Sequence, residues 1–328
     1  MVPAEDSRSR RADPGTLHLR TVVGLVPDES IAVADVGASL GLPDSEIRLF
    51  TRFLGLDRVP SAGKLSVSDM LLSAGEEALA GEDRSRVGYL IHAHTLQHLA
   101  PPSMRIVGSL RDKLGLGEAR AFAMSHQSCV TGLYALKVAE ALLRAEPVGR
   151  TALLLFGEKV LSTTMRCLPQ ATVLGDAAAA CLVALGGPGD AVLGMAHRTL
   201  GEFYESGNMA PGLRVRYRQI YAPVMAEVME NAVRGTGLTM DDISLVLPHN
   251  VNRYSWSVIA KELRLPLSRV YLENVPKTSH CFCADPFVNL TTARAEGAVN
   301  PGEVVLMVSA GEGGTFGAVV VRVARGDV

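Results

Sequence analysis

The chain has 328 residues, a formal net charge of −2, and 48% hydrophobic but only 5% aromatic residues. The near-neutral charge excludes a general nucleic-acid or anionic-membrane binder. No apolar run approaches the roughly 18 residues that cross a bilayer. A core rich in Ala, Val, Leu and Gly is typical of α/β packing rather than of a disordered chain.

Residues 1–15 are predicted to form a flexible arm, because they are charged and carry Pro3 and Pro14. They lack the apolar segment of a signal peptide. Five cysteines, an odd number without regular spacing, favour a reducing compartment. We therefore expect a cytoplasmic protein. The pair Cys281 and Cys283 has no second pair to complete a zinc site.

Residues 83–93 are predicted to form a polar segment followed by a short apolar strand, and this strand ends at a histidine. His92, His94 and His98 are closely spaced there, which raises the possibility of a metal site and of a metal-dependent hydrolase. No carboxylate is interleaved with these histidines, so we expect them to line a pocket, and we expect no metal and no cofactor.

Cys129 lies in a turn between an apolar strand, Ala121–Met124, and a segment with helical spacing, Leu133–Leu143. Free N–H groups and the helix dipole at a helix N-terminus favour a thiolate. The same N–H groups can hold an acyl oxygen that becomes negatively charged. Cys129 is therefore the candidate nucleophile, and the alternative is a small buried apolar residue.

The order strand, turn, helix, strand occurs twice, which indicates a duplicated α/β unit. We predict an N-terminal half at 16–187 and a C-terminal half at 188–328, divided at a Gly-rich break. The strands lack clean alternation, so we expect two sheets with helices on both sides and between them. The remaining predicted elements are strands at Thr151–Phe156, Ala178–Ala184, Ser244–Leu247 and Val304–Ser309, and a helix at Phe287–Ala298.

Two histidines of the second half are candidate catalytic residues. His249 follows a buried strand, where α/β folds open onto their sites, and it can act as a base or a donor to a carbonyl oxygen. His280 lies in the turn that corresponds to the Cys129 turn, with Asp285 in the following segment. The alternatives are an ordinary loop histidine for His249 and a helix cap for His280.

The loop Gly311–Gly317 follows the last buried strand but one. Its glycines permit close backbone approach, so the loop can direct an N–H group at a reacting oxygen. It matches no nucleotide-binding pattern.

Together these motifs resemble the thiolase superfamily of condensing enzymes, and their order and spacing most resemble β-ketoacyl-acyl-carrier-protein synthase III. The motifs are Cys129 at the start of a central helix, His249-x-x-Asn252, the Gly-Asp-Ala-Ala-Ala-Ala stretch from Gly175, and the loop from Gly311. The likeness spans about residues 25–323. It implies a five-layered αβαβα fold and a homodimer. It also implies an acyl-accepting Cys129, a catalytic His249, and an oxyanion hole from Cys129 N–H and the segment Gly311, Glu312, Gly313 and Gly314.

The chain departs from the family at one active-site motif, because Thr278-Ser279-His280-Cys281 stands where the family has Gly-Asn-Thr-Ser. Equal spacing from His249 puts Ser279 at the asparagine that helps to hold the enolate during decarboxylation. A one-residue slip puts His280 there, as in the Gly-His pair of elongating synthases. We expect His280 to face Cys129 and His249.

The coenzyme A-gripping residues of the family are also poorly matched. Arg52 fits one arginine, but Arg48 replaces the tryptophan and Thr163 a second arginine. These mismatches favour an acyl-carrier-protein thioester over acyl-coenzyme A as the donor, and both donors stay open. The departures also favour specialised metabolism of the polyketide or fatty-acid-like kind.

The sequence thus predicts an acyltransferase of the ketosynthase III type. Cys129 forms an acyl-S-enzyme from a thioester, and His249 and His280 assist transfer to a hydroxyl or an amine. Decarboxylative condensation with a malonyl thioester is the first alternative. A non-catalytic partner subunit of a heterodimeric condensing enzyme is the second, and the presence of Cys129 and His249 argues against it.

Overall fold

The structure, a computed structural model, describes residues 15–96, 99 and 104–325. Apart from Gly15, the predicted N-terminal arm lies outside these residues. Within them, no helix has the length and apolar character needed to cross a bilayer.

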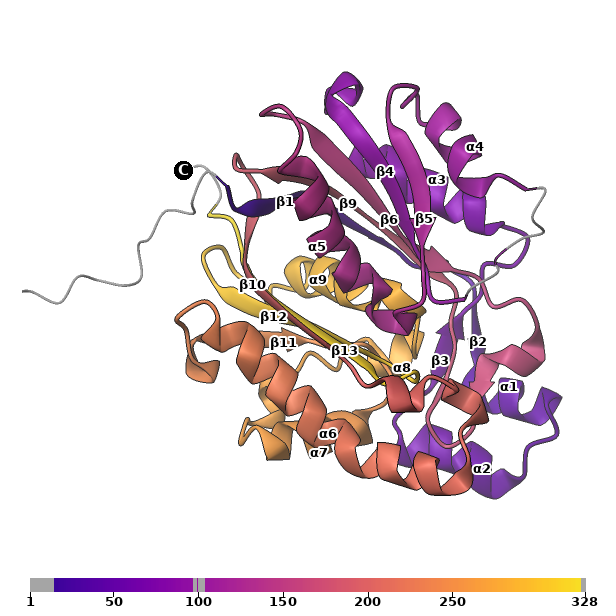
Figure 1. Ribbon diagram of the computed structural model, residues 1–328. Coiled ribbons are helices and arrows are strands. Elements are labelled where there is room, and N and C mark those ends of the chain that lie inside the picture. The colour runs from indigo at the N-terminus through magenta and orange to yellow at the C-terminus, as the bar shows by residue number, and fades with distance from the viewer. Residues whose placement is uncertain (1–14, 97–98, 100–103, 326–328) are drawn as a thin grey trace, which may run out of the picture.

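Nine strands form the central sheet, and the strand order repeats in its two halves (Figure 1). In sheet order they are β11 (Leu245–Leu247), β12 (Val304–Gly311), β13 (Thr315–Arg322), β10 (Asp190–Thr199), β1 (Leu17–Leu25), β9 (Ala177–Leu185), β6 (Thr151–Glu158), β4 (Val87–Ala93) and β5 (Arg120–Met124). Strands β4, β5 and β6 are parallel, as are β11 and β12, whereas the other pairs are antiparallel. A parallel bridge between Val246 and Val270 occupies the place in the second half that β5 has in the first.

The helices and the two half-sheets make five layers (Figure 1). Helices α3 and α4 cover the outer face of the first half-sheet, α6 and α7 cover the second, and α5 and α9 lie between the two. The helices are α1 (Val33–Ser39), α2 (Asp44–Arg48), α3 (Val67–Ala78), α4 (Ile106–Lys113), α5 (Thr131–Leu143), α6 (Pro211–Arg234), α7 (Arg253–Glu262), α8 (Val275–Thr278) and α9 (Asp285–Ala295). Two small two-stranded sheets pair β2 (Ser30–Ala32) with β3 (Arg58–Pro60), and β7 (Cys167–Leu168) with β8 (Thr172–Val173). The predicted duplicated αβαβα fold is confirmed.

The expectation of two separate sheets is wrong in one respect, because β1 and β10 join the half-sheets through His18↔Ala191 and Leu19↔Asp190. The tight turn before β10 brings this strand beside the start of β1. Gly189 makes the approach possible, since a Cβ there would lie 2.3 Å from Leu19 O. The predicted division between residues 187 and 188 falls in this turn, and the assignment of 16–187 and 188–328 as two separate domains stays a prediction.

Element boundaries agree closely with the sequence patterns, with one larger difference. The helix predicted to continue to Ala298 ends at Ala295. Gly297 has a φ of +71°, a left-handed conformation that terminates helices.

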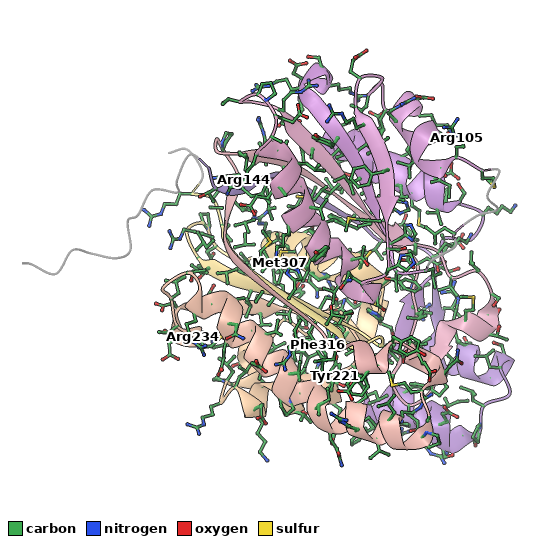
Figure 2. All side chains as sticks on the ribbon, in the orientation of Figure 1. Arg105, Arg144, Tyr221, Arg234, Met307 and Phe316 are labelled. Atoms are coloured by element: carbon green, nitrogen blue, oxygen red, sulfur yellow. The ribbon has the colours of Figure 1, made fainter. Side chains whose placement is uncertain are left out.

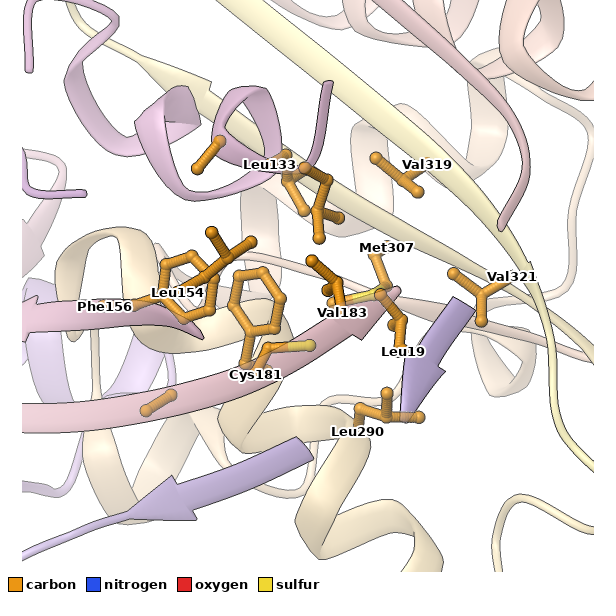
Figure 3. Packing of buried hydrophobic residues seen from close by; sticks show 14 of the residues in the cluster. Leu19, Leu133, Leu154, Phe156, Cys181, Val183, Leu290, Met307, Val319 and Val321 are labelled. Atoms are coloured by element: carbon orange, nitrogen blue, oxygen red, sulfur yellow. The ribbon is translucent and has the colours of Figure 1, made fainter. Parts of the chain in front are cut away.

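The core between the half-sheets fixes the two central helices (Figure 3). Leu133 of α5 and Leu290 of α9 pack among buried side chains of both half-sheets, including Met307 of β12. Phe156 and Phe287 stack with their ring centroids 3.8 Å apart. Cys129 lies in the turn before α5 and His280 in the turn before α9, so this packing holds the two turns against each other.

Candidate active site

The Cys129 turn is a constrained connection between β5 and α5. Cys129 is 8% exposed and lies in a 3-10 turn, Ser128–Val130, that leads directly into α5. His126 and Ser128 have positive φ angles of 74° and 50°, a conformation that costs energy for residues with a side chain and often marks functional sites. Gly132 lets α5 lie close to the second half, because a Cβ there would be 2.7 Å from Cys283 O.

The Cys129 sulfur faces a histidine–aspartate pair from the other half of the chain. Cys129 Sγ lies 3.1 Å from His280 Nε2, and His280 Nδ1 lies 2.5 Å from Asp285 Oδ2. All three side chains are buried. Nδ1 donates to the carboxylate, so Nε2 is the ring nitrogen directed at the sulfur. A thiol, an imidazole and a carboxylate in this order are a nucleophile, its base and the group that orients the base.

Backbone donors hold Asp285, the first residue of α9, in place. Its Oδ1 accepts from Cys281 N at 2.8 Å, and its Oδ2 accepts from Asn250 N at 2.6 Å. The Asn250 side chain bonds to Asn289, which ties the His249 loop to α9. These contacts fix the carboxylate, and through it the His280 ring.

Two opposing effects act on the pKa of His280. Burial alone lowers it, but the nearby Cys129 sulfur and the Asp285 carboxylate together raise the pKa well above the usual value for histidine. His280 therefore holds a proton in the resting site. The imidazolium faces the Cys129 sulfur at 3.1 Å and can stabilise negative charge that develops there.

His249 packs beside His280 but differs from it electrostatically. Its ring centroid is 5.8 Å from that of His280, and its Nε2 is 2.9 Å from the Tyr221 hydroxyl. Burial, with a smaller effect from the charge of His280, lowers the pKa of His249 well below its usual value. His249 is therefore neutral beside a protonated His280.

The glycine loop between β12 and β13 lies against the Cys129 turn. A Cβ on Gly311 would be 2.3 Å from Ser128 Cβ. Ser309 donates to Cys129 O at 2.9 Å. The Tyr217 hydroxyl donates to Gly311 O at 3.0 Å, and Glu312 accepts from Ser206 at 3.2 Å. This placement is compatible with the expected oxyanion hole, which stays a prediction.

Three predicted substrate-binding residues have other contacts. Ser279 does not take the inward position given by equal spacing, because its hydroxyl donates to Arg58 O at 3.0 Å. Asn252 caps α7 by accepting from Ser255 N at 2.7 Å and donates to Ala171 O at 2.9 Å. Arg52 is exposed in a π-helical turn, Leu49–Phe53. Ser279 and Asn252 thus have structural contacts, and a role in substrate binding for these two residues and for Arg52 stays a prediction.

The histidine cluster has structural contacts as well. His92 Nε2 donates to Gly157 O at 3.1 Å and His94 Nδ1 to Leu96 O at 2.6 Å, whereas His98 lies outside the described residues. Burial, with a contribution from His94, lowers the pKa of His92 to about 3. Among the residues that the structure describes, no three potential ligands gather as a metal site would require.

Sequence reasoning gave no role to three residues that the structure brings to this region. Asp285 was visible as a neighbour of His280, and its position at the start of the next helix was the available signal. Tyr221 lies in the middle of α6, and no local pattern connects it with His249. Glu158, at the end of β6, is fully buried and accepts from Leu96 N at 3.1 Å and from Thr95 N.

The fold and this site together define a thiolase-fold protein with a buried cysteine–histidine–aspartate arrangement at the seam of two duplicated halves. Solved structures with the same fold include ChlB3, described as an acyltransferase, with a TM-score of 0.82 at 23% identity over 94% of this chain and 98% of that one. They also include 3-oxoacyl-(acyl carrier protein) synthase III from Pseudomonas aeruginosa, with a TM-score of 0.79 at 20% identity over 94% of this chain and 99% of that one.

Within that class, the chain resembles β-ketoacyl-acyl-carrier-protein synthase III. Residues 233–323 match the family described as 3-oxoacyl-[acyl-carrier-protein] synthase III, C-terminal. A β-ketoacyl-[acyl-carrier-protein] synthase III of Cereibacter sphaeroides is 28% identical over 326 residues, covering 93% of this chain and 98% of the relative. A second, from Nitratidesulfovibrio vulgaris, is 27% identical over 281 residues, covering 78% of this chain and 83% of the relative.

Proposed function

We propose that this protein is an acyltransferase that carries an acyl group on Cys129 and passes it to a hydroxyl or an amine without decarboxylation. The observation that carries the proposal is the continuous contact from Cys129 through His280 to Asp285, at 3.1 and 2.5 Å. This arrangement supplies a nucleophile and a base that can serve both half-reactions.

In the first half-reaction, the Cys129 thiolate attacks the carbonyl carbon of an acyl thioester. The carbonyl oxygen becomes negative and is held by N–H groups of the Cys129 turn and the Gly311 loop. The bond to the leaving sulfur breaks, and the leaving thiolate takes the proton from His280 Nε2. The products are a free thiol, an acyl-S-Cys129 thioester and a neutral His280.

In the second half-reaction, neutral His280 accepts the proton of the acceptor while the acceptor oxygen or nitrogen attacks the acyl carbon. Asp285 stabilises the imidazolium that forms, because it accepts from Nδ1. The tetrahedral intermediate breaks at the carbon–sulfur bond. Cys129 leaves as a thiolate beside protonated His280, which restores the resting site.

The inward position of His280 was expected to support decarboxylation by likeness to elongating synthases. Its contact with Asp285 changes this interpretation. One nitrogen of His280 is committed to the carboxylate and the other to the sulfur, which suits a base more than a fixed donor to an enolate. The fold alone does not distinguish acyl transfer from decarboxylative condensation, since the solved structures with this fold include both an acyltransferase and a condensing enzyme. Decarboxylative condensation therefore stays the alternative.

Features of the surface support proposals for the acyl donor and for the oligomeric state. Phe53 and Tyr254 form an exposed aromatic pair with ring centroids 4.8 Å apart, and Arg52 and Arg253 are also exposed. Aromatic and guanidinium groups suit a phosphate-bearing donor, either acyl-coenzyme A or an acyl carrier protein. Strand β5 is the edge of the sheet, so we propose that a homodimer forms by pairing this edge with that of a second copy.

Intact-protein mass spectrometry tests the proposal. The wild type and Cys129→Ala are incubated with a panel of acyl-coenzyme A and acyl-carrier-protein thioesters. An adduct of one acyl group is expected on the wild type alone. An equal yield on Cys129→Ala would remove the proposed nucleophile.

A further inference from the structure

The acyl-transfer steps give no task to His249 or to Tyr221, two buried residues that contact each other beside the proposed chemistry. Tyr221 lies on α6, facing the second half-sheet, and packs against Phe316 of β13 with ring centroids 5.8 Å apart (Figure 2). Its hydroxyl is 2.9 Å from His249 Nε2. Tyr221 therefore occupies the ring nitrogen that His249 would otherwise present to a substrate.

Both ring tautomers of His249 leave Nε2 engaged by Tyr221. His249 Nδ1 is buried without a hydrogen-bond partner among the described residues. If Nε2 carries the ring proton, it donates to the Tyr221 oxygen; if Nδ1 carries it, Nε2 accepts from the Tyr221 hydroxyl. In neither state can Nε2 donate to a substrate.

Decarboxylation of a malonyl thioester needs such a donor. The bond between the α-carbon and the carboxylate breaks, carbon dioxide leaves, and the electron pair stays on the thioester as an enolate. The enolate oxygen must be held by N–H groups. In this site His280 Nε2 faces sulfur, His280 Nδ1 faces Asp285, and His249 Nε2 faces Tyr221.

We propose that Tyr221 is a specificity-determining residue that disfavours decarboxylation of malonyl-type thioesters by engaging His249 Nε2. The inference rests on the proposed acyl-transfer function and explains how a condensing-enzyme fold can be restricted to it. Removal of the hydroxyl frees Nε2 to donate to a thioester oxygen and should open the decarboxylative reaction.

Tyr217 provides a matched control on the same helix. Its hydroxyl also contacts a group near the site, because it donates to Gly311 O at 3.0 Å, and its ring lies 5.8 Å from that of Tyr221. Tyr217→Phe removes one buried hydroxyl from α6 but leaves the contact between Tyr221 and His249 in place.

The experiment uses the full chain with malonyl-coenzyme A as the probe, and measures carbon dioxide release and, separately, acyl loading of Cys129. The ratio of decarboxylation to loading should rise roughly tenfold or more in Tyr221→Phe, below the 10²–10³ that a preorganised oxyanion donor contributes. Tyr217→Phe should keep the wild-type ratio. Tyr221→Leu, which packs differently, should show the same increase, and Tyr221→Phe combined with His249→Ala should lose it.

An unchanged ratio in both folded Tyr221 variants would overturn the inference, as would an increase that survives the loss of His249. An equal increase in Tyr217→Phe would also contradict it. Failure of the acyl-transfer proposal has a different signature, namely a wild-type protein that is never acylated on Cys129.

Discussion

His280 and Asp285 form a buried pair in which Nδ1 of the imidazole lies 2.5 Å from Oδ2 of the carboxylate. The pair links the turn before α9 to the first residue of that helix, and it directs the opposite nitrogen of His280 at the Cys129 sulfur. A histidine that only occupied the usual asparagine position would not need this carboxylate. The pair therefore favours a role for His280 as the base that deprotonates an incoming acceptor over a role as a donor to an enolate.

Asp285→Asn should slow transfer of the acyl group by about 10²–10⁴, the range of general acid–base catalysis. The amide keeps the size of the side chain but cannot neutralise the imidazolium that forms when His280 takes the proton. Single-turnover kinetics of pre-acylated enzyme measure this step. A transfer rate within about twofold of the wild type would show that the carboxylate only supports the loop.

His249→Ala should slow transfer more than loading. Loading depends on the contact between Cys129 and His280, which does not include His249. We expect a decrease of about tenfold in transfer, because the His249 ring packs edge-on against the His280 ring, which must accept the proton of the acceptor in that step. Rapid-quench measurement of the two steps separates them, with His280→Ala, which should impair both, as the reference. A larger effect of His249→Ala on loading would contradict this division.

Gly311→Ala should destabilise the protein and disturb the Cys129 turn. The new Cβ would lie 2.3 Å from Ser128 Cβ, and overpacking of this kind costs about 1–3 kcal/mol in the free energy of unfolding. Gly313→Ala is the control, because a Cβ there has nothing within 4 Å. Urea denaturation compares the two variants, and equal stability would disprove the close approach.

Glu158 should make stability depend on pH. Burial raises the pKa of its carboxyl from 4.5 to about 8, so the folded state holds a proton that the unfolded chain has lost between these pH values. The free energy of unfolding should therefore fall as the pH rises through this window, by the order of a few kcal/mol. Glu158→Gln retains an oxygen for the N–H groups of Thr95 and Leu96 but cannot ionise. Its stability should be flatter over this range, and parallel curves for the two proteins would refute the assignment.

Much of this architecture is accessible from the sequence because its signals are local. The strand–turn–helix pattern around Cys129 and its counterpart around His280 predict the duplicated fold and bring both residues to the seam. The contact of His280 with sulfur confirms the expected placement, whereas equal spacing wrongly favoured Ser279.

The remaining features depend on contacts across the fold. Tyr221, on α6, forms a hydrogen bond with His249. Asn252 donates to Ala171 O and caps α7. No spacing in the sequence encodes these partners. The pairing of β1 with β10 was missed for the same reason, since it depends on a close approach at Gly189.

The most direct test of the account is a chase of acyl-Cys129 enzyme with competing acceptors. Pre-acylated protein is divided between an alcohol or amine panel and malonyl-coenzyme A, and intact mass, product mass and carbon dioxide are followed together. The account predicts loss of the acyl group from Cys129 into an ester or amide without carbon dioxide. Turnover confined to malonyl-coenzyme A, with a β-ketoacyl product and one carbon dioxide released per acyl group, would contradict it.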